Sequence, residues 1–308
     1  MIMSLHAEHI DLTLRQLEIF VAVARLEHAT RAGEELGLTQ SAISLAISEI
    51  ERLCHGPLFA RIGRNLRLND RGRLLLEEAD GVLARMRLLS ERMTSEEGNP
   101  AGLLRLGAST TIGNYLLPSI IGAFTRRYRR ARVELAIGNT HQIEERVEAG
   151  HLDLGLIEGP EILPGLSISH WRDDELVVVV SPRHPWARRR RARPSDLGHA
   201  AWLARERGSG TREVFEAAMA EAALKPCVKL ELGHTEAIKQ AAAANLGVAC
   251  LSRLAVDRDL SHGRLVEVAT PLNLKRRLSL VTRQSQIATP LLNSLLAFLR
   301  RKRPTIAS

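Results

Sequence analysis

The stretch from His28 to Leu53, HATRAGEELGLTQSAISLAISEIERL, predicts two short helices joined by a tight turn. Leu36-Gly37 ends the first helix, because glycine adopts the left-handed conformation after a helix at little cost. Thr39 offers a hydroxyl as the N-cap of the second helix, which carries helical periodicity from Gln40 to Leu53. The stretch is therefore a candidate helix-turn-helix.

The second helix has two different faces. One stripe is apolar and predicts a side that faces a core: Ile43, Ala46, Ile47, Ile50 and Leu53. The opposite stripe is short, uncharged and mostly polar: Ser41, Ser44, Leu45 and Ser48. Small side chains can approach base edges closely, as a recognition helix requires, and we take these four residues as candidate DNA contacts. The alternative is an ordinary amphipathic helical pair on the surface of an all-α domain.

The flanking residues extend this pattern. Thr13-Leu-Arg-Gln16 is a capping box that opens an earlier helix. The segment 60–70, ARIGRNLRLND, predicts a small β-hairpin or wing, in which Arg61 and Arg64 are candidates for contacts to phosphates or to a minor groove. A solvated basic loop is the alternative. The flanks therefore favour a winged helix-turn-helix.

A long helix is predicted from Asn69-Asp70 to about Thr94. Apolar residues recur in a 3-4 alternation typical of a coiled-coil seam: Leu68, Leu75, Ala79, Val82, Met86, Leu89 and Met93. We expect Leu75, Val82, Met86 and Leu89 to form a dimer interface, with packing against the chain's own body as the alternative. The polar segment 95–102, SEEGNPAG, predicts a hinge or domain boundary.

After this boundary strands and helices alternate, which predicts parallel sheets with helices on their faces. The first set comprises strand 103–107, helix 112–128, strand 133–137, helix 141–149 and strand 153–157. The second comprises strands 175–180 and 201–204, helix 211–223, strand 228–232, helix 236–244 and strand 248–251. Strand 278–282 and helix 290–301 are expected to return to the first sheet. We therefore predict two α/β lobes with a cleft between them.

The predicted domains are a winged helix-turn-helix at 12–69, a linker helix for dimerisation at 70–95 and an effector-binding domain at 102–303. Within the last, lobe I is about 102–170 plus 270–303 and lobe II about 171–269.

Four turns after predicted strands are rich in hydroxyls and glycine. Helix N-termini beyond the carboxyl ends of strands direct free N–H groups at ligands. The candidate effector-binding residues in these turns are Ser109, Thr110, Thr111, Asn139, Thr140, Gly208, Ser209, Gly210, Thr211 and Thr235. They supply donors with few acids, which favours a small, partly desolvated anion, whereas plain N-capping is the alternative for each turn alone. Glu236 is expected nearby and is awkward for an anion unless it orients a donor.

The composition bounds the class of protein. At 308 residues we expect two or three units, and the 45% apolar and 25% charged residues are typical of a soluble globular protein. No run approaches the about 20 apolar residues that span a bilayer, and no secretory signal is visible, so we expect a cytoplasmic protein without membrane contact. The odd number and unrelated spacing of Cys54, Cys227 and Cys250 argue against a disulfide framework and a zinc site. We expect no metal and no cofactor.

The net charge of +8 does not belong to the helix-turn-helix. Residues 1–100 hold 12 basic and 15 acidic residues, whereas the remainder holds 31 and 20. A local basic strip in the first part matters more for phosphate attraction than the total charge: Arg61, Arg64, Arg67, Arg71 and Arg73. The basic runs 126–132, 188–193 and 275–277 are expected to be solvated faces.

Enzyme signatures are weak. RGSGTR lacks the Lys-Ser/Thr ending of a P-loop, neither a GxSxG elbow nor an HExxH pair occurs, and the spacing of His151, Asp153 and Ser181 implies no triad. We predict that the protein is not an enzyme and that no residue is catalytic.

The chain resembles the LysR-type transcriptional regulators. The resemblance rests on LTLRQLEIFVAVARLEHATRAGEELGLTQSAISLAISEIERL and PLFARIGRNLRL, and continues through LGASTTIGNYLLP, DLGLIEGP, ERGSGTRE, LELGHTEAIKQA and LGVACLSRLAV. The later motifs are most similar to the regulators of sulfur-assimilation or sulfite-response genes, with the carbon-fixation operon regulators nearby. In this sequence Ala29, Gly33, Cys54-His55 and Ala60 depart from the usual family residues.

The resemblance implies a fold and a function. The fold is a winged helix-turn-helix, a linker-helix dimer interface and a two-lobed effector domain like the type II periplasmic binding proteins. The implied function is regulation of transcription by a homodimer or homotetramer that binds double-stranded promoter DNA, with effector binding changing DNA bending. By position in the family motif, Gln40, Ser41, Ser44 and Arg61 would contact DNA, and Arg31 and Arg64 are further candidates. RNA polymerase is a candidate partner. The subfamily favours a sulfite- or sulfate-sized anion, with a phosphorylated metabolite as the alternative. The alternative from another class is an α/β small-molecule-binding protein whose helical N-terminus only dimerises it.

Overall fold

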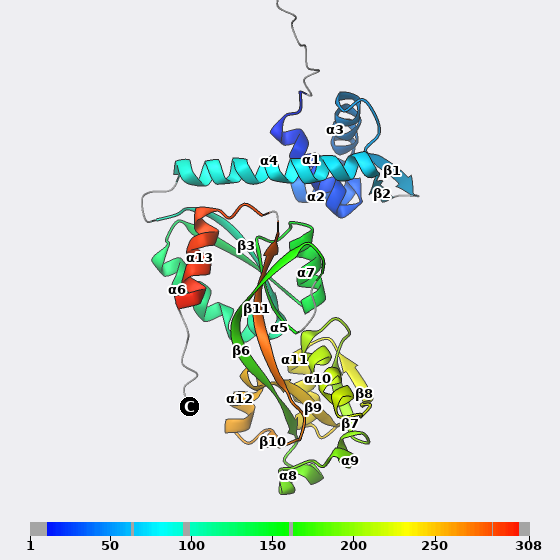
Figure 1. Cartoon of the computed structure of the whole chain (residues 1–308), viewed down its shortest axis with the longest axis vertical. Helices are drawn as coiled ribbons and strands as arrows, with labels where there is room; N and C mark the ends of the chain where they lie inside the picture. Colours follow the sequence, from blue (N-terminus) through cyan, green and yellow to red (C-terminus); the bar gives the residue numbers. More distant parts are fainter. Residues whose placement is uncertain (1–10, 63–64, 95–98, 160–162, 285, 302–308) are drawn as a thin grey trace, which may run out of the picture. The chain divides into compact units, whose positions relative to one another are not determined.

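The computed structural model describes residues 11–62, 65–94, 99–159, 163–284 and 286–301, and the chain divides into two compact units (Figure 1). The first unit contains α1 (Leu14–Leu26), α2 (Ala29–Leu36), α3 (Gln40–Leu53), β1 (Phe59–Ile62), β2 (Asn65–Leu68) and α4 (Asp70–Thr94). β1 and β2 pair antiparallel, so the predicted winged helix-turn-helix is confirmed.

Local signals set the helix ends in this unit. The Thr13 hydroxyl and the Gln16 side chain form the predicted capping box of α1. Gly37 ends α2 at φ 66°, and the Thr39 hydroxyl accepts a bond from the Ala42 N–H at 3.2 Å. His55, one of the departures from the usual family residues, adopts the left-handed conformation at φ 54°. The α3 stripe packs inward, with Ile43 and Ile50 fully buried together with Phe20.

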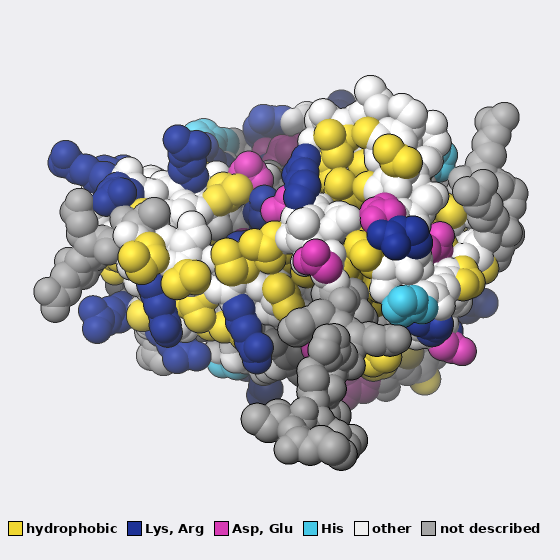
Figure 2. Space-filling view, turned by 90° about the horizontal axis from the view of Figure 1, so that it is seen from above, with side chains coloured by type: hydrophobic (Ala, Val, Ile, Leu, Met, Phe, Trp, Pro, Cys, Tyr) yellow, Lys and Arg dark blue, Asp and Glu magenta, His cyan; other side chains and the backbone are white. Residues whose placement is uncertain are grey.

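The apolar stripe of α4 has two parts. Leu75 and Ala79 pack against the core of their own unit, where Ala79 is 1% exposed. Farther along, four apolar side chains are 39–78% exposed: Val82, Met86, Leu89 and Met93. Hydrophobic side chains lie in a row on the face seen in Figure 2, with Lys and Arg beside them. The first half of the predicted seam therefore serves the unit's own core, and the second half is uncovered.

The second unit is an α/β structure around a long mixed sheet. Its elements are β3 (Gly102–Ser109), α5 (Thr110–Tyr115), α6 (Leu117–Arg127), β4 (Ala131–Gly138), α7 (Thr140–Glu148), β5 (Leu154–Glu158), β6 (Leu166–Val180), α8 (Pro185–Arg189), α9 (Pro194–Leu197), β7 (Ala201–Arg205), α10 (Gly210–Glu221), β8 (Cys227–Leu232), α11 (Thr235–Ala243), β9 (Val248–Ser252), α12 (Arg253–Ser261), β10 (Val266–Val268), β11 (Lys275–Arg283) and α13 (Pro290–Arg301).

The sheet explains the two lobes. Its strand order is β4-β3-β5-β11-β6-β9-β7-β8, with β10 beside β6. Strands β3, β4 and β5 are parallel in lobe I, as are β7, β8 and β9 in lobe II. β6 leads out of lobe I and β11 leads back, so these two crossing strands pair antiparallel with each other (Figure 1). The return of β11 to the first sheet is confirmed by its pairing with β5.

Three sequence predictions in this unit are corrected. The sheet is mixed rather than parallel because of β6 and β11. The helix expected over 112–128 is two helices, α5 and α6, with a break at Leu116 (φ −114°) and Pro118 in the first turn of α6, where proline is tolerated. β6 starts at Leu166 rather than Glu175, because the alternation of its first residues, LSIS, is short and is followed by the polar run HWRDD. No helix in the described part of the chain is long and apolar enough to cross a membrane.

Candidate functional site: a recognition helix and an interlobe hydroxyl cluster

The polar face of α3 is presented to the outside. Gln40, Ser41, Leu45 and Ser48 are exposed, with Leu45 at 74%, and Ser44 is partly exposed. The Gln40 amide donates to the Ser44 hydroxyl at 2.9 Å, so these two side chains are arranged together on the surface. Between residues 40 and 48 the helix carries no charge, which leaves hydroxyl, amide and methyl groups for base edges.

The arginines predicted for this surface have different positions. Arg31 is exposed on α2. Arg61 lies in β1, where only its backbone is described, and Arg64 lies outside the described residues. Arg71 of the basic strip is used internally, because its guanidinium donates to the carbonyl oxygens of Cys54 (2.5 Å) and His55 (3.4 Å) at the end of α3.

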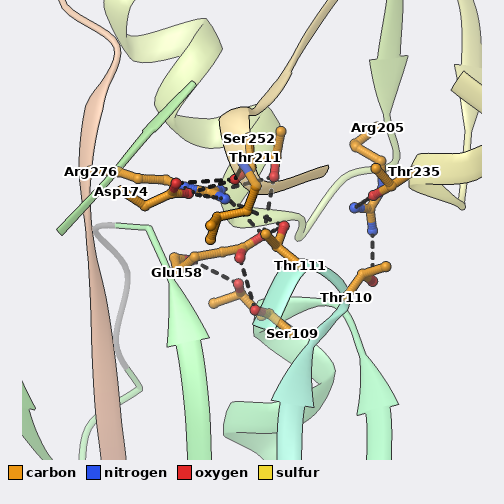
Figure 3. A network of polar contacts seen from close by, with 12 residues as sticks. Ser109, Thr110, Thr111, Glu158, Asp174, Arg205, Thr211, Thr235, Ser252 and Arg276 are labelled. Atoms are coloured by element: carbon orange, nitrogen blue, oxygen red, sulfur yellow. Dashed lines mark hydrogen bonds and ion pairs between the residues drawn. The ribbon is translucent and has the colours of Figure 1, made fainter. Parts of the chain in front are cut away.

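In the second unit, hydroxyl groups from both lobes converge on a buried carboxylate (Figure 3). Glu158 ends β5 and is 1% exposed. Ser109 donates to its Oε2 at 2.9 Å, and Thr111 of lobe I and Thr211 of lobe II donate to its Oε1, each at 3.1 Å. We call Ser109, Thr111, Thr211 and the guanidinium of Arg276, 3.2 Å from Oε1, the cradle. The cradle holds an oxyanion that belongs to the chain itself.

Arg276 connects the cradle to the crossing strands. It lies on β11 directly opposite Asp174 on β6, with a guanidinium–carboxylate distance of 2.7 Å, and its side chain is 1% exposed. It also donates to Thr211 at 2.9 Å and to Thr111 at 3.3 Å, while Ser252 donates to both Asp174 oxygens. A single buried cation thus lies between two buried carboxylates.

Two predictions are wrong here. Run 275–277 is not wholly a solvated face, because strand alternation buries Arg276 between exposed Lys275 and Arg277. The cleft is also not poor in acids, since Glu158 and Asp174 lie within it. The sequence does carry a signal for Arg276, which continues the buried i, i+2 alternation of Leu278 and Leu280. Glu158 closes a wholly buried strand, LGLIE, where a charge needs partners.

A second guanidinium joins the lobes. Arg205, at the end of β7, is 2% exposed and donates to Thr235 of α11 at 3.1 Å and to Thr110 of α5 at 3.2 Å. Two bonds of 2.8 Å to the Glu206 carboxylate balance its charge. Thr110 in turn donates to the Gly138 carbonyl at 3.2 Å. Sequence reasoning missed Arg205, which ends a buried strand in the same way as Glu158.

The remaining predicted cleft residues have different roles, and the two glycines make direct contacts between the lobes. Thr140 donates to the Glu158 carbonyl at 2.8 Å, and a Cβ at Gly210 would lie 1.8 Å from the same carbonyl oxygen, so only glycine fits. The Gly208 carbonyl accepts from the His141 N–H at 3.2 Å. Asn139 caps α7 with its side chain, whereas Ser209 is buried at the start of α10 without making a capping bond.

At the edge of the cleft, Tyr115 of α5 donates to the Glu236 carboxylate of α11. Lys239 donates to the same carboxylate at 2.9 Å and pairs with Asp259 at 2.7 Å. Burial and the bond to Glu236 raise the pKa of the Tyr115 phenol well above its ordinary value. Glu236 therefore orients two donors, the Tyr115 hydroxyl and the Lys239 ammonium group.

Among the described residues no three acidic, histidine or cysteine side chains lie together as a metal site would require.

Comparisons with known proteins agree with this architecture. Residues 14–73 match the model of the bacterial regulatory helix-turn-helix protein of the lysR family, and residues 97–304 match the LysR substrate binding domain. The HTH-type regulator YeiE of Escherichia coli, described as uncharacterized, is 39% identical over 85% of this chain and 87% of its own. CbbR of Rhodospirillum rubrum is 34% identical over 95% of this chain and 97% of its own, and CysL of Bacillus subtilis is 30% identical over 86% of this chain and 89% of its own.

Solved structures show the same fold. A full-length OxyR variant of Pseudomonas aeruginosa aligns with a TM-score of 0.72 over 96% of this chain and 97% of its own, at 24% identity. The regulatory domain of CcmR from Synechocystis, solved with 2-PG, aligns with a TM-score of 0.60 over 65% and 96%, at 29% identity. CbnR, solved with its target DNA, aligns with a TM-score of 0.59 over 94% and 99%, at 20% identity.

Proposed function

Since the chain belongs to the LysR family of bacterial helix-turn-helix transcriptional regulators, we propose that it binds promoter DNA as an oligomer and that a small oxyanion between its lobes alters this binding. The proposed limits are 12–69 for DNA binding, 70–95 for dimerisation and 102–303 for effector binding. Sulfite or sulfate is the preferred effector class.

The uncharged face of α3 supports the DNA contacts. Gln40, Ser41, Ser44, Leu45 and Ser48 would meet base edges, while Arg31, Arg61 and Arg64 would meet phosphates. The uncovered stripe of α4 supports the oligomer, because exposed apolar side chains at coiled-coil spacing pair with a second copy. A two-fold protein would place two recognition helices on a two-fold site, and RNA polymerase is a candidate further partner.

One observation carries the effector proposal: the cradle already binds an oxyanion. Three hydroxyls and one guanidinium surround the Glu158 carboxylate, with donors from both lobes. A free oxyanion of similar size would find the same donors once the Glu158 side chain moved away. Because Thr211 belongs to lobe II and the other hydroxyls to lobe I, exchanging the internal anion for a free one would favour a different lobe arrangement. That change would alter how the recognition helices meet DNA and hence its bending.

A phosphorylated metabolite is the second candidate, and the CcmR domain solved with 2-PG favours it. A phosphate monoester would use the cradle for its phosphate and Arg205 for further oxygens. The two candidates differ in size and in their dependence on Arg205.

A thermal-shift titration of the purified protein with sulfite, sulfate, phosphate and 2-PG tests the effector class. At 100 times its Kd a ligand stabilises the folded state by about 2.7 kcal/mol, which corresponds to a rise in Tm of roughly 5–10 °C. Sulfite or sulfate should produce the rise in the intact protein and in Ser195→Ala, an exposed hydroxyl outside the cradle, but not in Thr211→Val. No rise with any of these oxyanions would contradict the effector proposal.

Gel-shift titrations test the DNA contacts. Ser44→Ala should change base preference within the operator, and the free energy of discrimination between bases should change by about 1–3 kcal/mol at a contacted base. Arg61→Ala should weaken binding to all sequences alike. If neither variant changes promoter binding, the assignment of α3 and the wing as the DNA surface is wrong.

A further inference from the structure

Lobe II carries a dense group of positively charged side chains around α8 that take no part in the cradle. Residues 183–196 hold six arginines and one acid. We call Arg183, Arg188, Arg189, Arg190, Arg191 and Arg193 the arginine cluster, and all six are exposed. They lie on α8 and in the segments beside it (Figure 1).

Little of this charge is neutralised within the protein. Arg189 pairs with Asp196 at 2.8 Å and lies over the Trp186 ring at 5.7 Å. Among the described residues, no carboxylate lies within ion-pairing distance of Arg188, Arg190 or Arg191. The cluster is therefore open to an external anion.

The backbone that presents the cluster is fixed. Trp186 is buried in the core of lobe II and anchors α8. The Arg190 carbonyl accepts from the Ala269 N–H, and the Ala192 N–H donates to the Ala269 carbonyl, both at 2.9 Å. Arg190 adopts a left-handed conformation at φ 47°, which glycine would adopt with less strain. The backbone hydrogen bonds to Ala269 already hold this turn, so the charge of Arg190 does not contribute to the stability of the fold.

Mutual repulsion of six guanidinium groups is relieved by a partner with regularly spaced negative charges. Arginine in particular forms bidentate bonds with phosphate oxygens. The polyanion that this protein meets in its proposed function is duplex DNA, with one phosphate per about 1.7 Å of helix axis.

We propose that the arginine cluster binds the phosphate backbone of DNA flanking the operator, as a second DNA contact separate from the helix-turn-helix. The proposal rests on the DNA binding proposed above. Contacts to flanking phosphates would add affinity without sequence preference and would favour DNA curved around the oligomer.

The test compares the intact protein with a triple variant, Arg188→Ser, Arg190→Ser and Arg191→Ser, on operator fragments with short and long flanks. For the wild type, extending the flanks should raise affinity, and for the variant it should not. On long fragments the slope of log K against log salt should fall by about 2.7 per contacting protomer, because each phosphate contact contributes about 0.9. Binding to the short operator should stay within twofold, so failure of this proposal is distinguishable from loss of DNA binding itself.

Two matched variants complete the test. Replacing Arg126, Arg129 and Arg132 of lobe I by serine removes the same charge from another exposed arginine run and should leave the flank effect intact. Replacing Arg188, Arg190 and Arg191 by lysine should restore most of the salt slope. An unchanged slope in the serine variant of the cluster, or an equal loss in the lobe I variant, would overturn the proposal.

Discussion

At the scale of single residues, the interlobe site is governed by the balance of three buried charges. Arg276 lies between Glu158 and Asp174, and its guanidinium is their shared cation. A buried ion whose partner is removed is left with an uncompensated desolvation cost, which is larger than the gain from the original pair. This asymmetry makes each of the three residues a sensitive point for substitution.

Arg276→Met should destabilise the folded state by about 3–5 kcal/mol, because both carboxylates lose their cation in a site closed to water. Urea denaturation followed by circular dichroism measures the change. Arg277→Met, the exposed neighbour on the same strand, should change stability by less than about 0.5 kcal/mol. Equal effects of the two substitutions would show that Arg276 does not carry the network.

Glu158→Gln should strengthen oxyanion binding about tenfold, since the amide keeps the shape of the side chain while removing the like charge that competes for the cradle. Isothermal titration calorimetry with sulfite measures the affinity. Glu144→Gln, a buried glutamate on α7 outside the cradle, is the matched control and should leave it unchanged. Weaker sulfite binding by the Glu158 variant would argue against displacement of the internal carboxylate.

At the scale of elements, the helices and short strands were largely predictable because their signals are local. Capping residues such as Thr13 and Thr39, and Gly37 after α2, determine the conformation of their own neighbours. The crossing strands were harder to predict. Asp174 and Arg276 are 102 residues apart, and their direct pairing follows from the return of β11, which no local pattern encodes. The hydroxyls of the cleft could therefore be named in advance, but the charges that they bind could not.

The exposed stripe of α4 predicts an oligomer that charges should disrupt. Met86→Glu with Leu89→Glu would place carboxylates within an apolar seam and should convert the oligomer to smaller species. Size-exclusion chromatography with light scattering gives the mass. Leu74→Glu, an exposed leucine on α4 about a quarter turn from the stripe, should not change it. An unchanged mass in the double variant would mean that α4 is not the interface.

The contact between α5 and α11 should depend on alkaline pH. The pKa of Tyr115 is raised in the folded state, so the contribution of its protonated phenol is fully present below about pH 10, where the unfolded chain also keeps its proton. Above that pH the unfolded chain loses its proton first, and stability should decline as pH rises.

Tyr115→Phe should cost about 1 kcal/mol at pH 8, since one hydrogen bond to Glu236 is lost, and should remove part of the alkaline decline. Urea midpoints at pH 8 and pH 10.5 test both statements. The same alkaline decline in the variant as in the wild type would assign it to other groups.

At the scale of the whole molecule, the family follows from the two matched regions, and the proposed regulation would follow from how the lobes are joined. The same hydroxyls that would bind an effector now bind Glu158, and they come from both lobes. An effector that exchanges with Glu158 would have to change the contacts that hold the lobes together, and this links ligand binding to conformation without a separate switch.

The most direct test is a DNase I footprint of the intact protein on its own promoter, with and without millimolar sulfite. We expect a footprint whose length and hypersensitive sites change with sulfite in the wild type, and a footprint that does not respond to sulfite in Thr211→Val. A footprint that is identical in all four conditions, or no footprint at all, would contradict this expectation.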